Sequence, residues 1–502
     1  MFVILLRISL SSVMTSDGAN NALQAWDILH GNVLLHGWII GDATYYTFEL
    51  PQYAMVELFV GLRGIDPHLV AALTYLIVAG CGLALARTGS SGAAAAARSA
   101  VVVTVLATPL VGERGVSRLL ESPDHIGTSA ILLACFLLID RAPGRRFTAS
   151  LLGVILCAGQ LGDATVRYIA VPAVIVVCGY RVLAARKIRS TDAAIALAAA
   201  ASVPLALVAR AVMLHFGAYA MVPPPAGFSP LGHWPQNALL DWQNVISLFG
   251  AADLHPGTAA GTATAAFGLA CLLAATAGFG KVLWTWRRAS LADQLVCVTI
   301  ILYYTVYVFS SVPPGRLYEI AGILPCGAVL AARACVPGRF ASAARGKTAL
   351  VAAALVALLP LAVAASRPPA KQPAVSIAAW LEAHGLRYGI AGYWDASAVT
   401  LQSGDRVQVR AVRFSVRFVA GAWEAKPSWY NASQHDATFV IADPPHAYGA
   451  DNIAASTFAR YFGRPVARYW VGYRTILIYR INLLKHVVPG SSAPDDRRRT
   501  VV

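Results

Sequence analysis

The sequence predicts a polytopic α-helical membrane protein with a small mixed α/β domain at its C-terminal end. Of its 502 residues, 57% are hydrophobic and only 13% are charged, whereas average soluble domains carry about 25% charged residues. The apolar residues also recur in blocks from residue 68 to residue 365. Each block approaches the ~20 residues that a membrane-spanning helix needs. Beyond residue 366 the composition changes, and short strand and helix patterns alternate.

We expect eleven spanning segments in the first three-quarters of the chain. They lie near 1–15, 68–86, 99–112, 126–140, 148–163, 166–185, 193–214, 259–283, 295–312, 320–336 and 348–365. The first block is short and contains Arg7. We therefore expect either a short, tilted helix or a start that lacks a few cytoplasmic residues. A signal peptide is not indicated, because no charge precedes the apolar run and no small-residue cleavage site follows it.

Lys and Arg between the blocks predict the side of the membrane on which each connection lies. Five stretches, alternating along the chain, are rich in these residues. They run from Arg87 to Arg98, Arg141 to Arg146, Arg181 to Arg189, Lys281 to Arg288 and Arg333 to Lys347. The positive-inside rule places these stretches in the cytoplasm, and the other connections with everything after residue 366 outside. The formal charge of +15 then reflects topology, and nucleic acid is not an expected partner.

Two long external loops are predicted, at 15–67 and 217–258. In the first, Ala22, Trp26 and Leu29 share one helical face, which suits a helix lying in the membrane interface. Pro51 is positioned to open a second short helix. We assign residues 1–365 to the transmembrane domain, 366–490 to the α/β domain and 491–502 to a disordered basic tail.

The C-terminal domain is expected to alternate strands and helices. Helices are predicted at 377–385, through DASAVTLQS and at 453–463, strands through RYGIAGY, RVQVRAV and ATFVIAD, and a hairpin through VARYWVGYRTILIYRI. All eight cysteines fall in or beside hydrophobic blocks, without CxxC or Cys/His metal spacing. We interpret them as small buried apolar side chains.

Ionisable residues are informative because the membrane is a poor environment for charge. The candidates for a polar site share one property, a predicted position at the outer face, in an external loop or beside a span. They are Asp17, Asp42, Glu121, Asp124, His125, Asp163, Arg167 and Arg316. Any one of them alone is also compatible with a helix cap or an interface marker. As a group they predict a polar cavity that opens outward.

Four motifs carry a resemblance to a known family. They are TSDGANNALQAWDILHGN, ESPDHIGT, GRLYEIAGILPCGAVLAAR and AGYWDASAVTLQSGDRVQVRAV. In this order they resemble the GT-C superfamily of membrane glycosyltransferases, in particular the protein O-mannosyltransferases and the lipid A aminoarabinose transferases. The architecture is similar over most of the chain, whereas the similar motifs are short.

The resemblance implies a transferase that moves a sugar from a polyprenyl-phosphate donor, held in the bundle, to a lipid, glycan or protein acceptor outside. Asp17 matches the acid of the first external loop that acts as base or orients the acceptor. The family's common acid pair is absent, since Gly18 follows Asp17. A second acid would be Asp42, Glu121 or Asp124, and a divalent metal is left open.

The chemistry of such a transfer agrees with these residue types. Attack by an acceptor hydroxyl on an anomeric carbon requires removal of its proton, which a carboxylate can accept. Negative charge also stabilises an oxocarbenium-like transition state. The departing polyprenyl phosphate is anionic, and arginine binds phosphate well through its planar fork. Arg316 and Arg167 are the candidates for that contact, in an inverting reaction.

The sequence is also compatible with two other functions. One is a non-catalytic relative or membrane scaffold whose external domain binds a partner. The other is a transporter or flippase, which should show repeated halves and broken spans near mid-membrane, and the sequence shows no such repeat. In each case the protein is expected in the plasma membrane, and its alanine-rich composition suggests a bacterium.

Overall fold

The computed structural model describes residues 1–112, 119–141, 145–184, 190–222, 227–252, 259–312, 317–336, 361–444 and 452–490. The chain divides into two compact units, each described here by itself. Unit 1 comprises Met1–Ser12, Ala71–Arg210 and Pro225–Pro369, and unit 2 comprises Val13–Val70, Ala211–Pro224 and Ala370–Val502. The first long loop therefore groups with the C-terminal residues, not with the helical bundle to which composition assigned it.

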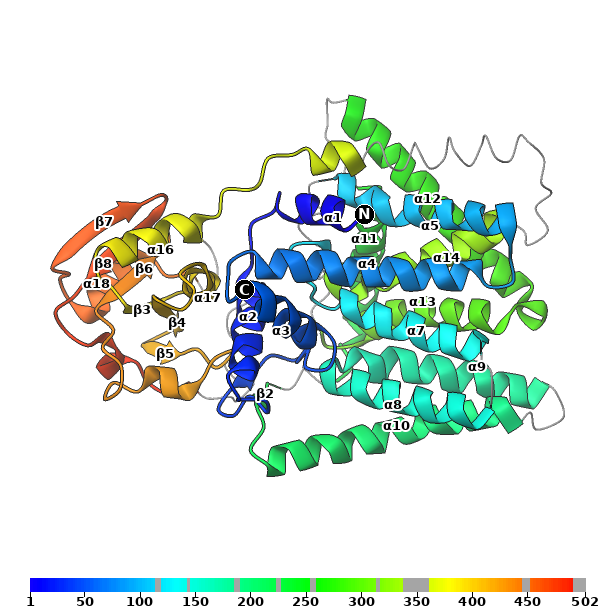
Figure 1. Cartoon of the computed structure of the whole chain (residues 1–502), viewed down its shortest axis with the longest axis horizontal. Helices are drawn as coiled ribbons and strands as arrows, with labels where there is room; N and C mark the ends of the chain where they lie inside the picture. The colour runs from blue at the N-terminus through cyan, green and yellow to red at the C-terminus, as the bar shows by residue number, and fades with distance from the viewer. Residues whose placement is uncertain are drawn as a thin grey trace. The chain divides into compact units, whose positions relative to one another are not determined.

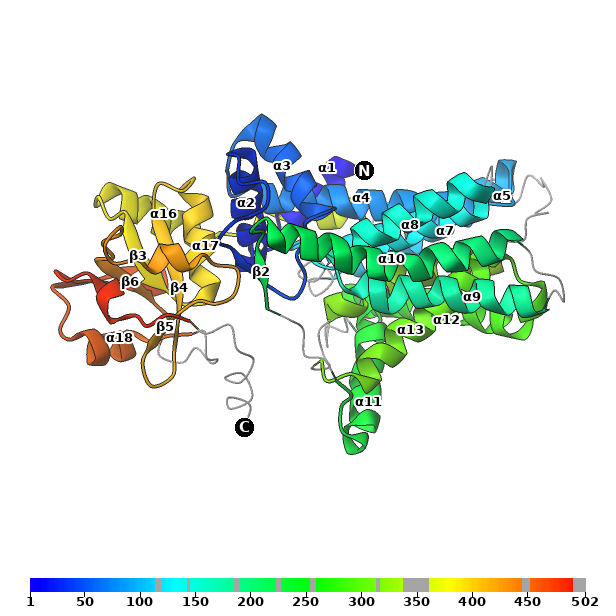
Figure 2. The same cartoon turned by 90° about the horizontal axis from the view of Figure 1, so that it is seen from below.

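Most of the long helices of unit 1 lie side by side, whereas α11 runs across them (Figures 1 and 2). Its helices are α1 (Phe2–Ser9), α4 (Asp66–Arg87), α5 (Gly92–Val111), α7 (Ile126–Arg141), α8 (Arg145–Gly162), the π-helical turn η1 (Val166–Ala170), α9 (Val171–Ala184), α10 (Ser190–His215), α11 (Trp234–Leu248), α12 (Ala259–Trp284), α13 (Leu291–Phe309), the 3₁₀ turn η4 (Leu317–Ile320) and α14 (Ile323–Cys335). The first residues of α4 and the last of α10 belong to unit 2.

Seven helical segments in the described part of the chain are long and apolar enough to cross a membrane. They are Asp66–Arg87, Gly92–Val111, Val166–Ala184, Thr191–His215, Gly261–Trp284, Leu291–Phe309 and Leu317–Cys335. The polytopic class is thus confirmed, while the expected number of eleven spans stays a prediction.

Four of the expected spans are not among these seven. The segment expected at 1–15 contains only α1, whose eight residues extend about 12 Å, well short of the ~30 Å hydrocarbon core. The segments expected at 126–140 and 148–163 correspond to α7 and α8, with 16 and 18 residues. Most of the span expected at 348–365 lies outside the described residues.

Helix α14 is the most deeply buried helix of unit 1 that the structure describes. Every residue from Ile323 to Ala332 is buried, and the helix packs against α5, α12 and α13. Gly278 of α12 allows close approach, because a Cβ there would lie 2.6 Å from the carbonyl oxygen of Leu330. Small residues at such crossings let helix backbones approach in a membrane, where packing has to replace the hydrophobic effect.

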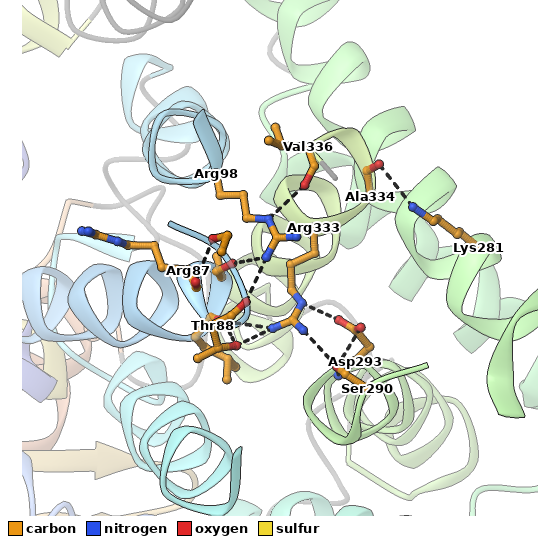
Figure 3. A network of polar contacts seen from close by, with 12 residues as sticks. Arg87, Thr88, Arg98, Lys281, Ser290, Asp293, Arg333, Ala334 and Val336 are labelled. Carbon is orange, nitrogen blue, oxygen red and sulfur yellow. Dashed lines mark hydrogen bonds and ion pairs between the residues drawn. The ribbon is translucent and has the colours of Figure 1, made fainter. Parts of the chain in front are cut away.

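Basic residues from separate predicted cytoplasmic stretches converge on one polar network (Figure 3). Arg98, only 6% exposed, donates to the carbonyls of Ala86, Thr88 and Val336 at 3.1, 3.0 and 2.9 Å. It thereby satisfies carbonyls at the C-terminal ends of α4 and α14 that have no partner within their helices.

Arg333 lies beside Arg98 and binds the start of α13. It pairs with Asp293 at 2.7 Å and donates to Ser290 Oγ at 2.9 Å. Lys281 donates to the carbonyl of Ala334 at 3.4 Å. Residues of the first, fourth and fifth basic stretches therefore meet at one end of the bundle, as the charge alternation requires.

Unit 2 contains a six-stranded mixed sheet with helices on both faces. Its elements are α2 (Ser16–Leu29), β1 (Ile39–Ile40), α3 (Glu49–Val60), β2 (Ala220–Met221), α16 (Pro373–Ala383), β3 (Tyr388–Ala391), α17 (Tyr393–Gln402), β4 (Gln408–Phe414), β5 (Phe418–Ala420), the 3₁₀ turn η5 (Pro427–Tyr430), β6 (Phe439–Ala442), α18 (Ala455–Phe462), β7 (Ala467–Val471) and β8 (Arg474–Ile478). The strand order is β5-β4-β3-β6-β8-β7. Strand β3 is parallel to β4 and β6, and the other neighbours are antiparallel.

Alternate residues of the central strands enter two different apolar clusters. Phe439 and Ile441 pack with α2, α16 and α17 on one face, whereas Val440 and Ala442 pack with α18 on the other. A strand covered on both faces reads as a continuous apolar run, which is why FVIA is recognisable in the sequence. The predicted strands and helices of this domain are confirmed, and only the short edge strand β5 was not expected.

Helix α2 differs from the predicted interfacial helix. Every residue from Ser16 to Ala25 except Asp17 is buried, including Asn20, Asn21 and Gln24. Its polar face is covered by protein, since α2 packs against α3 and α17. The apolar face of α2 predicted a helix at the membrane interface, but in this stretch protein covers both its apolar and its polar residues.

Candidate acidic site on helix α2

Asp17 is held at the first turn of α2 by the local geometry of the helix start. Thr15 caps the helix, and its Oγ1 accepts a hydrogen bond from the amide of Gly18 at 3.2 Å. Ser16 Oγ donates to the carbonyl of Tyr393 at 2.7 Å, which joins α2 to the start of α17. A carboxylate is favoured at this end of a helix, because the unpaired amides carry partial positive charge.

Tyr393 links Asp17 to a second carboxylate. Its phenol donates to Asp17 Oδ1 and lies 3.1 Å from Glu424 Oε2. Asn20 Nδ2 donates to the same phenol oxygen at 3.3 Å, and Ser397 Oγ in turn donates to Asn20 Oδ1. Two carboxylates and one phenol are thus assembled from three segments of unit 2.

The environment of Tyr393 keeps its phenol protonated. Burial raises the pKa of Tyr393 well above its ordinary value, and the nearby carboxylates of Asp17 and Glu424 raise this pKa further. A phenol carries a single proton, so it donates to only one of the two carboxylates at a time. The arrangement can therefore exchange a proton between Asp17 and Glu424 through one oxygen atom.

The backbone around Glu424 is held in an unusual conformation. Glu424 has φ +49° and is 6% exposed. Non-glycine residues in the left-handed region are uncommon and are strained by roughly 1–3 kcal/mol. The next residue, Ala425, exchanges backbone hydrogen bonds with Ile39 of β1, at 2.8 and 3.1 Å. This pairing fixes the turn that brings Glu424 to Tyr393.

The predicted histidine and acid of unit 1 form a separate cluster. His125 Nδ1 lies 3.1 Å from Asp163 Oδ2, and Thr128 Oγ1 donates to the same carboxylate oxygen. The His125 ring also stacks on Tyr318, with centroids 5.7 Å apart. The ESPDHIGT and GRLYE segments therefore meet, and the 5% exposed Asp163 joins the start of α7 to the end of α8.

Comparison with known proteins assigns the fold. No protein-family model matches the sequence, and no curated protein matches it. Among solved structures, apo ArnT from Cupriavidus metallidurans is similar over 97% of both chains, with 13% identity and a TM-score of 0.58. The same enzyme bound to undecaprenyl phosphate is similar over 95% of both chains, with 14% identity and a TM-score of 0.55. The chain has an ArnT-like fold.

A weaker likeness is to AglB from Archaeoglobus fulgidus, in complex with an inhibitory peptide and a dolichol-phosphate. It has 12% identity, covers 88% of this chain and 68% of that chain, and has a TM-score of 0.47. This likeness is too weak to support an argument. The architecture that the four motifs predict is thus supported by the match to ArnT over nearly the whole chain.

Within this fold, the structure brings together only some of the predicted site residues. His125 and Asp163 are in contact, whereas Arg167 donates from Nε to Gln160 at 3.2 Å. Glu121 and Asp124 lie in the same connection as His125. Arg316 lies outside the described residues.

In unit 2 the partner of Asp17 is not one of the predicted second acids. Asp42 is half-buried and follows β1, the strand beside the Glu424 turn. Glu424 is not predicted from the sequence, because its segment, GAWEAKPSWY, lies in the C-terminal domain and far from any predicted span. A signal did exist for Tyr393, which belongs to the AGYWDAS segment of the resemblance. Asp395 in that segment forms an ion pair with Arg474 at 2.8 Å.

Proposed function

We propose that this protein is an inverting glycosyltransferase that moves a sugar from a polyprenyl-phosphate donor to an acceptor outside the cytoplasm. The observation that carries the proposal is the Asp17–Tyr393–Glu424 cluster at the start of α2, within a GT-C fold. Asp17 is the one residue between Ser16 and Ala25 that is not buried. It can therefore meet a substrate while its neighbours hold it in place.

In the proposed reaction, Asp17 acts as the general base. The hydroxyl oxygen of the acceptor attacks the anomeric carbon, and its proton passes to the Asp17 carboxylate. The bond from the anomeric carbon to the phosphate oxygen breaks, and polyprenyl monophosphate leaves with the electron pair. The negative charge of the acidic pair stabilises the positive charge that develops on the sugar ring.

Tyr393 and Glu424 are assigned supporting roles. The phenol of Tyr393 orients the Asp17 carboxylate through the hydrogen bond that it donates. Once Asp17 has taken a proton, Tyr393 can accept it while passing its own proton to Glu424, 3.1 Å away. The charge of Asp17 is then restored without contact between the two carboxylates.

The donor is proposed from chemistry and from the comparison. ArnT was crystallised with undecaprenyl phosphate, which is a polyprenyl phosphate. Arg167 lies in the π-helical turn η1, a local irregularity that is frequent at functional sites. We retain Arg167 and Arg316 as the proposed ligands of the donor phosphate.

The divalent metal that the resemblance leaves open is not assigned a role, and the proposed steps involve the side chains alone. In the described ranges, no group of three or more His, Cys, Asp and Glu side chains is arranged to hold a metal ion. Arginine and the acidic pair supply the charges that the reaction requires.

We also propose that the sheet domain of unit 2 lies outside the cytoplasm, in the plasma membrane of a bacterium. The convergence of Arg98, Lys281 and Arg333 at one end of the bundle supports the charge alternation from which this topology follows. A reporter fused after residue 370 should be active only outside the cytoplasm. A reporter active in the cytoplasm would contradict the topology and the proposed side of the reaction.

The decisive experiment is a transfer assay with the purified full-length protein in nanodiscs. Synthetic undecaprenyl-phosphate sugars serve as donors, and envelope lipid, glycan and protein fractions serve as acceptors. We expect sugar transfer with release of undecaprenyl phosphate. If neither transfer nor donor hydrolysis occurs across the donor panel, the proposal is wrong and a non-catalytic, partner-binding role is favoured.

A further inference from the structure

A second polar site lies in unit 2, at the opposite end of α2 from Asp17. It is a pocket of about 260 Å³, slightly below the roughly 300 Å³ at which drug-sized sites begin. Helix α2 contributes Trp26 and Asp27, and the sheet domain contributes Arg410 and Trp429. We propose that this pocket binds one neutral sugar residue of a glycan, through its hydroxyl groups and its apolar ring face.

The aromatic lining supports this choice of ligand. The indoles of Trp26, Trp38 and Trp429 all line the pocket. Trp38 meets Trp429 edge to face, with centroids 5.0 Å apart, and the guanidinium of Arg410 lies 3.9 Å from the Trp429 centroid. Rigid indoles can contact the apolar face of a sugar ring at low entropic cost. A purely ionic ligand would gain little from them.

The polar groups present donors and acceptors together. Asp27 Oδ2 accepts from Lys426 at 2.5 Å, Trp38 Nε1 at 2.8 Å and Asn32 Nδ2 at 2.7 Å. All three hydrogen bonds go to Oδ2. The other carboxylate oxygen, Oδ1, accepts no hydrogen bond from the described residues and is available to a ligand. Asp405 Oδ2 likewise accepts from Gln408 at 3.1 Å, while Oδ1 has no protein donor in the same described part.

Arg410 supplies the donors. Its side chain is 5% exposed. Its Nε donates one hydrogen bond, to the hydroxyl of Tyr388 at 3.4 Å. Its two terminal amino groups make no hydrogen bond to any described residue, although the side chain lines the pocket. These amino groups are open to the pocket and not sealed in the protein, so the hydroxyl groups of a bound ligand can accept hydrogen bonds from them.

Charge decides between a neutral and an anionic ligand. The carboxylates of Asp27 and Asp405 balance the cations Lys426 and Arg410, so the lining has no net formal charge. An anion attracted by Arg410 would be repelled by two carboxylates whose second oxygens are available. A sugar hydroxyl can donate to a carboxylate and accept from a guanidinium. Convergent donors and acceptors with aromatic surface therefore favour a neutral sugar.

The distance from Asp17 shows which part of a glycan would bind. Asp27 follows Asp17 by ten residues in the same helix, which is about 15 Å along its axis. The sugar held here is therefore not the one whose hydroxyl reacts. Given the proposed function, a sugar bound far from the reacting hydroxyl would hold a glycan acceptor in place and supply binding energy away from the reaction centre.

A direct binding experiment tests the pocket separately from catalysis. The full-length protein in nanodiscs is titrated with the methyl glycosides of glucose, galactose, mannose and arabinose and with their disaccharides. Indole fluorescence and saturation-transfer NMR report binding. Inorganic phosphate and glucuronate are the anionic probes. We expect saturable binding of at least one neutral glycoside, without binding of phosphate.

Two variants locate the site, and one serves as a matched control. Trp429→Ala removes an aromatic surface, and Gln408→Ala removes the amide that holds Asp405; each should weaken glycoside binding at least tenfold. Trp470→Ala, at a 69% exposed indole outside the pocket lining, should leave binding unchanged. Thermal unfolding shows whether each variant is folded. If Trp429→Ala does not fold, Gln408→Ala alone tests the pocket.

Three results would overturn the inference. The first two are the lack of saturable glycoside binding by folded wild-type protein, and glycoside binding that both pocket variants retain. Phosphate binding in place of glycoside binding would likewise make the pocket an anion site. Glycoside binding without any transferase activity would leave the pocket standing and contradict only the proposed reaction.

Discussion

Replacing Asp17 by asparagine removes one negative charge and leaves the side chain almost the same size. The amide oxygen can still accept the hydrogen bond from Tyr393, and Thr15 still caps the helix. The charged acceptor becomes neutral, which costs about 1 kcal/mol of folding free energy. Relief of the repulsion with Glu424, which shares Tyr393, opposes that loss. Expression and thermal stability should therefore change little.

The effect on turnover should be far larger. General-base catalysis typically contributes about 10²–10⁴-fold, which corresponds to about 2.7–5.4 kcal/mol of activation free energy. We therefore expect kcat of Asp17→Asn to fall by that factor, with donor binding nearly unchanged.

The assay is release of undecaprenyl phosphate from a synthetic donor by nanodisc-embedded protein at saturating acceptor. Asp436→Asn is the matched control, because Asp436 is an exposed acid of the same unit that takes no part in the acidic cluster. Turnover of Asp17→Asn within about threefold of the control would remove Asp17 as the base.

Three further outcomes are expected. Tyr393→Phe should lower kcat about tenfold and move the acidic limb of the pH–rate profile to higher pH, because the Asp17 carboxylate loses a donor that favours its ionised form; an unchanged profile would argue against the relay. Burial raises the pKa of Glu57 to about 10. The folded protein therefore retains a proton that the unfolded chain releases above the ordinary pKa of 4.5. The free energy of unfolding should consequently fall as the pH rises from about 4.5 to about 10. Glu57→Gln should therefore stabilise the protein by on the order of 1 kcal/mol at pH 8 and not at pH 4, as measured by thermal unfolding; equal effects at both pH values would contradict the buried, protonated state. Arg98→Met removes three hydrogen bonds to carbonyls and should destabilise by about 3 kcal/mol, whereas Met at the exposed Arg87 should not; equal melting temperatures for the two variants would refute the capping role.

The candidate site shows where prediction from sequence reached its limit. Asp17 was recognisable because it follows the first apolar block and belongs to a motif. Its partner Tyr393 is separated from it by 376 positions, and no local pattern links them. Glu424 was not recognisable, since an acid in a strained turn of a sheet domain resembles any surface acid. The role of Arg167 at a donor phosphate stays a prediction, and the structure adds the hydrogen bond that its Nε donates to Gln160.

The pocket at the other end of α2 is likewise formed by residues that are distant in the sequence. Lys426 and Asp27 are 399 positions apart, and neither is unusual in its own segment. Burial raises the pKa of Asp27, but the hydrogen bonds from Lys426 and Trp38 outweigh burial and leave this pKa below its ordinary value. That balance depends on which groups surround the carboxylate in space and cannot be derived from neighbours in the sequence.

The sequence by itself determined the membrane class, the apolar helices and the alternating strands and helices of the C-terminal domain. Each of these is a property of consecutive residues, because spanning a membrane requires about 20 apolar residues in a row and a strand covered on both faces requires a continuous apolar run. The tertiary structure alone decided that residues 13–70 group with the C-terminal sheet, and that Asp17 meets Tyr393 and Glu424. Such contacts arise when segments distant in the chain pack together, and hydrogen bonds and charges act over a few ångströms of space whatever the separation in sequence.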